Sequence, residues 1–201
     1  MISKLPTFRV QLIKPLHKSN TTTMDLTEAQ KDMRLAYMGG ADGAIVSGLL
    51  WISSGLLSPY LSQQSVILFF FFGGMLIHPL GILISKICKR TAKHKKENPL
   101  GKLALESTVI LFVGLFISYS IFQIKPDWFF PIMLLTIGVR YLIFQTLYGM
   151  KIYWLFGLAL MASGMYCLYT NQTFHIPAII GGLIELVFAF LIMRQEGNFP
   201  R

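Results

Sequence analysis

A run of nineteen residues, Val66 to Ile84, contains no ionisable side chain apart from that of His78. An α-helix of about 20 apolar residues is long enough to cross the ~30 Å hydrocarbon layer of a bilayer. The run therefore indicates a membrane span. The composition agrees, because only 13% of the residues are charged and 54% are hydrophobic, whereas roughly 25% are charged in an average soluble domain.

Five further segments have the same character, so that six spans are predicted. We place them at 37–57, 66–87, 103–122, 129–148, 152–170 and 176–193. Pro99, Pro126 and Pro177 lie near the start of three of these segments, where a helix tolerates proline. The predicted fold is an all-α, integral membrane bundle of about six transmembrane helices. It comprises a segment 1–34, a transmembrane domain 35–193 and a tail 194–201.

The basic residues predict the orientation of this bundle. With six spans, sixteen of the eighteen Lys and Arg residues fall on one side, and Lys125 alone falls on the other, while Arg140 lies within a span. Positive residues near helix ends stay in the cytoplasm, so both termini are expected there. Topology thus accounts for the net charge of +9, and no nucleic-acid partner is expected.

The N-terminal segment shows no signal peptide, because its first 35 or so residues are polar or mixed. We expect it to be partly disordered up to Thr23. Asp25 and Glu28 then stand three apart as a capping-box pair that opens a short helix. Met24 is an alternative start site.

Ionisable residues inside the predicted spans are the candidate binding residues. Each costs at least ~2.5–3.5 kcal/mol to insert, so each needs a partner, a cavity or access to the interface. The five are Asp42, His78, Glu106, Arg140 and Glu185. No metal-ligand spacing occurs among them, and no cofactor is predicted.

Arg140 is the strongest of these signals, because a guanidinium does not lose its proton in a protein. Glu185 lies at a similar depth in the sixth span and is the first-choice partner. Three interpretations stay open: a structural ion pair between the fourth and sixth spans, a substrate or proton site, and a side chain that reaches the interface.

The other candidates each have an ordinary structural interpretation. Gly39, Gly43 and Ser47 repeat at a spacing of four around Asp42, which is typical of close helix packing. His78 precedes Pro79, which predicts a kink, so this histidine either binds a proton or ligand or packs at the kink. Glu106 and Asp42 are shallow enough to cap helices or to contact the basic loop.

The loop Lys86–Lys102 is strongly basic and has the composition of a site for anionic lipid headgroups, besides setting the topology. Enzyme signatures are missing, since there is no His-Glu-x-x-His pair, phosphate-binding loop or aspartate-rich cluster. An enzyme is therefore not the favoured interpretation.

Three strings resemble a family of small bacterial multi-pass membrane proteins of unknown function. They are AYMGGADGAIVSGLLW from Ala36, NPLGKLALES from Asn98 and WFFPIMLLTIGVRYLIFQTLYGMKIYW from Trp128. The similarity extends from about Asp25 to Met193. It implies a multi-helix fold in the bacterial plasma membrane, and it supplies no activity.

Three functional hypotheses follow. The first is a bundle that transports or senses a small solute or protons through a polar site made by Arg140, Glu185 and His78. The second is a membrane scaffold or accessory subunit whose charges hold helices together. The third is a lipid-modifying enzyme that draws headgroups to the basic loop. The substrate and the oligomeric state are not predicted.

Overall fold

The structure, a computed structural model, describes residues 24–197. The predictions for the segment before Met24, including its disorder and the start site, and for residues 198–201 fall outside the described residues. These residues form seven α-helices: α1 (Leu26–Tyr37), α2 (Ala41–Leu57), α3 (Gln63–Ile87), α4 (Leu100–Phe122), α5 (Phe129–Tyr148), α6 (Ile152–Tyr169) and α7 (His175–Gly197). Short 3-10 turns at Met38–Gly40 and Pro126–Trp128 precede α2 and α5, and residues 24–197 contain no strand.

The prediction of an all-α bundle with six spans is confirmed. Six helical segments are long and apolar enough to cross a membrane, the first of them comprising α1 and α2 together. The bounds of α5 are those predicted, and α7 runs past the predicted end at 193 to Gly197. The chain is a multi-pass helical membrane protein.

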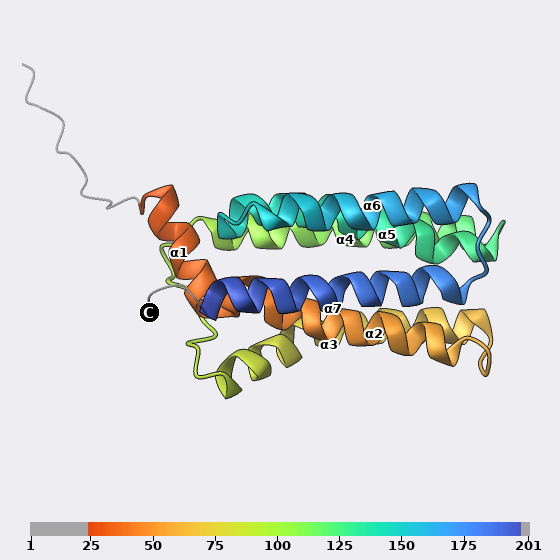
Figure 1. Ribbon diagram of the computed structural model, residues 1–201, viewed down its shortest axis with the longest axis horizontal. Coiled ribbons are helices and arrows are strands. Elements are labelled where there is room, and N and C mark those ends of the chain that lie inside the picture. Colours follow the sequence, from red (N-terminus) through yellow and green to blue (C-terminus); the bar gives the residue numbers. More distant parts are fainter. Residues whose placement is uncertain (1–23, 198–201) are drawn as a thin grey trace, which may run out of the picture.

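The first span is broken near its start by two consecutive glycines. Gly39 and Gly40 have φ values of +63° and +89°, a left-handed conformation that side chains other than hydrogen rarely adopt. The Tyr153 hydroxyl donates a hydrogen bond to the Gly39 carbonyl at this break. As a result α1 stands at an angle to α2 across one end of the bundle (Figure 1). Asp25 caps α1, since its side chain accepts a hydrogen bond from the Leu26 amide.

Glycines allow two helix pairs to pack most closely. A Cβ added at Gly182 of α7 would lie 2.7 Å from the carbonyl oxygen of Gly48 in α2. Gly138 and Gly157 make the same kind of contact between α5 and α6. Around Asp42 the packing is looser. Nothing lies within 4 Å of a Cβ added at Gly43, but a Cβ added at Gly81 of α3 would lie 3.5 Å from the Gly43 nitrogen, so α3 packs on α2 at this position. The tightest contact of α2 lies further along the helix, at Gly48.

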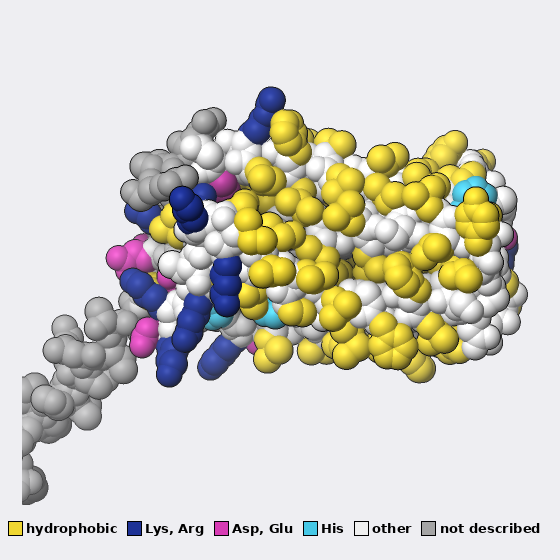
Figure 2. All heavy atoms as spheres, turned by 90° about the horizontal axis from the view of Figure 1, so that it is seen from below, with side chains coloured by type: hydrophobic (Ala, Val, Ile, Leu, Met, Phe, Trp, Pro, Cys, Tyr) yellow, Lys and Arg dark blue, Asp and Glu magenta, His cyan; other side chains and the backbone are white. Residues whose placement is uncertain are grey.

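Charged residues gather at the end of the bundle that carries α1, and hydrophobic side chains cover the rest of the face drawn in Figure 2. The end of α7 lies at the same end in Figure 1, as an even number of spans requires. Buried polar contacts join the elements there. Arg34 of α1 forms an ion pair of 2.7 Å with Glu196 of α7, and Asn98 donates hydrogen bonds to Asp32 and to the Ala29 carbonyl.

Candidate functional site

A cavity of about 570 Å³ lies between α2, α3, α4 and α5. Its size is within the range of small-molecule sites, about 300–1,000 Å³. Most of its wall is apolar, but polar side chains face it from every surrounding helix and from the connection between α3 and α4. They are Tyr37, Asp42, Ser47, His78, His94, Thr108, Arg140, Tyr141 and Tyr148. The cavity is therefore a largely apolar hollow within a membrane-spanning bundle, with polar side chains at a few positions in its wall.

Arg140 faces this cavity from α5. Its Nε–H donates to the Ser107 hydroxyl of α4 over a long 3.4 Å, and its guanidinium carbon lies 5.1 Å from the centre of the Phe144 ring. Among residues 24–197, no carboxylate oxygen lies within the 4.0 Å ion-pair distance of Arg140. The predicted ion pair with Glu185 is therefore wrong. A cation that faces a cavity without a carboxylate partner is suited to an anionic ligand.

Glu185 is instead sealed into the contact between α7 and its neighbours. Its side chain is fully buried, its Oε1 accepts a hydrogen bond of 3.2 Å from the Tyr141 hydroxyl, and the Ser47 hydroxyl lies nearby. Its Oε2 has no hydrogen-bond partner. Glu185 does not line the cavity, whereas Ser47 and Tyr141, which lie beside it, do. Glu185 and Arg140 attract each other electrostatically without forming an ion-pair contact.

Helical phase explains why the two predicted partners do not meet. Successive residues of an α-helix point about 100° apart, since there are 3.6 residues per turn. Tyr141 is turned toward Glu185 on α7, so the adjacent Arg140 is turned toward Ser107 on α4. The depth of the two residues in the membrane was predicted from the sequence, but their rotation about the helix axes was not.

Asp42 lines the cavity at the start of α2, and its carboxylate has two donors. The Ser85 hydroxyl of α3 donates to Oδ2 over 2.6 Å, and the Gly43 amide donates to Oδ1 over 2.8 Å. Asp42 is only 5% exposed. Its carboxylate thus joins the beginning of α2 to the last turn of α3.

The remaining two candidates, His78 and Glu106, differ in whether they line the cavity. His78 of α3 is exposed at its surface and lines the cavity. It directly precedes Pro79 inside α3, and the part of α3 that ends at Ile87 bends away from the bundle in Figure 1, as the proline predicted. Glu106 is exposed on α4 and does not line the cavity. The structure brings Arg140, Asp42 and His78 to one cavity and leaves Glu106 and Glu185 outside it.

Sequence reasoning did not identify the polar residues that close the cavity at the α1 end. His94, in the connection between α3 and α4, lies 2.9 Å from the Tyr37 hydroxyl of α1 through its Nδ1. Both residues line the cavity. Residues so far apart in the chain have no spacing signal that would pair them, and His94 stands among lysines whose evident role is topology. Residues 24–197 contain no cluster of three or more His, Cys, Asp or Glu side chains suited to a metal ion.

Comparison with known proteins gives one family. Residues 26–195 match a family of unknown function, DUF7010. No curated protein and no solved structure matches the chain.

Proposed function

The chain belongs to the DUF7010 family of unknown function, and from the geometry of its cavity we propose that it binds a small anionic ligand beside Arg140, as the site of a membrane transporter or sensor. One observation carries this proposal: the guanidinium of Arg140 faces a cavity of about 570 Å³ and has no carboxylate oxygen within ion-pair distance in the part of the chain that the structure describes.

The energetics support a ligand over a purely structural role. A charge within a membrane span costs several kcal/mol unless it is compensated. The contacts of Arg140 are a long hydrogen bond to Ser107 and the face of an aromatic ring. An anion in the cavity would add charge-assisted hydrogen bonds, each contributing about 1.5–3 kcal/mol.

The proposal does not extend to a proton pathway that includes Glu185. Such a pathway requires Glu185 and Arg140 to border one cavity, and Glu185 lies outside it. The contact of Glu185 with Tyr141 instead favours a structural role for this carboxyl. The second candidate function, a scaffold or accessory subunit, draws its support from this sealed contact and from the close α2–α7 packing at Gly182.

Ligand-dependent stability tests the proposal. The purified protein is heated in the presence of a panel of anions that ranges from soluble carboxylates and phosphates to acidic lipids. A ligand at 100 times its Kd raises the free energy of unfolding by about 2.7 kcal/mol. At least one anion is expected to stabilise the wild type and not the variant Arg140→Gln.

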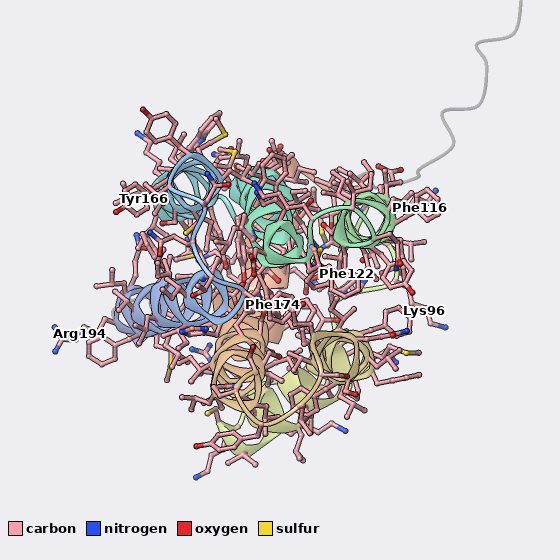
Figure 3. The ribbon with its side chains drawn as sticks, turned by 90° about the vertical axis from the view of Figure 1, so that its right-hand side faces the viewer. Lys96, Phe116, Phe122, Tyr166, Phe174 and Arg194 are labelled. Carbon is pink, nitrogen blue, oxygen red and sulfur yellow. The ribbon has the colours of Figure 1, made fainter. Side chains whose placement is uncertain are left out.

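The matched control is Arg194→Gln, which removes a cation that points away from the bundle near the end of α7 (Figure 3). This variant should keep the full response. If no anion stabilises the wild type more than it stabilises Arg140→Gln, the ligand site is refuted and the scaffold role is favoured.

A further inference from the structure

Helices α3 and α4 lie at one side of the bundle and do not pack closely on each other. α3 packs on α2, and α4 packs on α5. Figure 3, viewed along the bundle, shows the ends of α3 and α4 at the same side with Phe116 of α4 directed outward. In the 18-residue apolar stretch of each of these helices only 17% of the residues are buried, against 67% in the first span. Both helices therefore present most of their surface to the surroundings of the bundle.

The cavity at Arg140 opens between these two helices. Met75, Leu105 and Phe112 all line it, and yet their side chains are 61%, 71% and 57% exposed. Because Met75 belongs to α3 and the other two to α4, the opening faces sideways. In a membrane, this direction leads to lipid rather than to water.

A second hollow of about 340 Å³ continues the cavity toward the end of the bundle opposite α1. It too lies between α3 and α4. Phe71, Phe112 and Leu115 line both hollows, so the two adjoin. Its wall is almost wholly apolar, with Gln64 and Tyr119 as the polar residues. The two hollows together form a continuous groove, which we call the α3–α4 groove.

The α3–α4 groove has a polar end and an apolar end. Arg140, Asp42 and His78 lie in the half toward α1, and the second hollow forms the other half. On α4 the lining runs from Thr108, next to the Ser107 that contacts Arg140, to Tyr119, and these eleven helical steps correspond to about 17 Å. One leaflet of a ~30 Å hydrocarbon layer accommodates acyl chains about 15 Å long. The apolar part of the groove is thus as long as one acyl chain.

The charged side chains at the polar end of the groove determine which chemical group can bind there. Arg140 requires an acidic group, whereas the carboxylate of Asp42 is already held by Ser85 and Gly43. The basic segment Lys86–Lys102 lies at the same end, and its Lys96 projects on the side of α3 and α4 in Figure 3. Lysines at a membrane surface attract acidic lipids.

We propose that the α3–α4 groove binds an acidic single-chain lipid, whose carboxylate or phosphate lies against Arg140 and whose chain lies between α3 and α4. This inference rests on the proposed anion site and names its ligand class. The lipid enters sideways from the bilayer, between Met75 of α3 and Leu105 of α4.

Fluorescence quenching tests the inference, because Trp51 lies in the wall of the cavity and packs against Phe70 and Phe130. In a Trp128→Phe, Trp154→Phe background, Trp51 is the sole tryptophan. The probes are 9,10-dibromostearate, which is anionic, and its uncharged methyl ester. Half-quenching by the acid is expected at a roughly ten-fold lower mole fraction than by the ester, since one charge-assisted hydrogen bond is worth at least about 1.4 kcal/mol.

Variants test whether the preference for the acid over the ester depends on Arg140. Arg140→Gln should abolish it, Arg140→Lys should retain part of it, and Arg194→Gln should leave it unchanged. Equal quenching by acid and ester in the protein with native Arg140 would overturn the inference, whether or not the variants fold.

Competition separates this inference from the proposed function. Stearate is expected to relieve the quenching, and butyrate or inorganic phosphate at the same concentration is not. If the short anions displace the probe as well as stearate does, the lipid assignment fails and the anion site stands. If neither lipid nor soluble anions bind in an Arg140-dependent way, both fail.

Discussion

The hydroxyl of Tyr141 donates a hydrogen bond of 3.2 Å to the buried carboxyl of Glu185 and thereby joins α5 to α7. Helices α2, α5 and α7 meet around this pair, since Ser47 of α2 lies nearby. The contact excludes Glu185 from the cavity and turns the neighbouring Arg140 into it. The proposed function depends on this difference: Glu185 is buried in a helix contact, and the Arg140 cation faces the cavity.

The Glu185→Gln variant should be as stable as the wild type or more stable. The amide oxygen still accepts a hydrogen bond from Tyr141, and the change removes a carboxylate that burial disfavours. The Tyr141→Phe variant should lose about 1–3 kcal/mol, because it leaves the buried Oε1 without its donor. Thermal unfolding of the purified variants measures both effects. A marked loss of stability in Glu185→Gln alone would indicate that the ionised carboxylate is required.

The Gly182→Ala variant should be strongly destabilised, by about 1–3 kcal/mol as for other overpacked sites. The added methyl group would lie 2.7 Å from the Gly48 carbonyl oxygen and 2.8 Å from the Ile52 nitrogen. Gly43→Ala is the matched control, because nothing lies within 4 Å of its added Cβ. Equal melting temperatures for the two variants would argue against the α2–α7 seam.

Much of the fold was predictable because hydrocarbon thickness sets helix length. The span 129–148 was predicted to the residue, since its start has a proline and its end has a glycine. The break at Gly39–Gly40 was not, because a pair of glycines is typical both of close packing and of a left-handed turn. The cavity depends on how α3 and α4 diverge, and no residue pattern in either helix specifies that distance.

The candidate site was predictable only in part, for a similar reason. Membrane depth follows from position along a span, so Arg140 and Glu185 were correctly placed inside the bundle. Their contact also depends on the rotation of α5 and α7, which a nearly uniform apolar surface does not reveal. Hydropathy shows which charged residues lie within the spans, but the packing of the helices determines which residues they contact.

The orientation of the bundle is tested by reporter fusions. A reporter active only in the cytoplasm should be active when inserted after Lys93 and inactive when inserted after Asn171. The reason is the retention of Lys and Arg near helix ends on the inner side. The opposite pattern would place the basic loop, and the polar end of the groove, on the outer face.

The most direct test of the account is a double-mutant cycle of Arg140→Gln and Glu185→Gln, scored by the free energy of unfolding in detergent. Mutations at sites more than about 7–10 Å apart that share no partner usually add within about 0.5 kcal/mol. We predict a coupling energy well below that of a buried ion pair, because no ion-pair contact joins Arg140, which faces the cavity, to Glu185, which faces Tyr141. A coupling energy of several kcal/mol, as for a buried ion pair, would contradict the cavity-facing guanidinium on which the proposed ligand site depends.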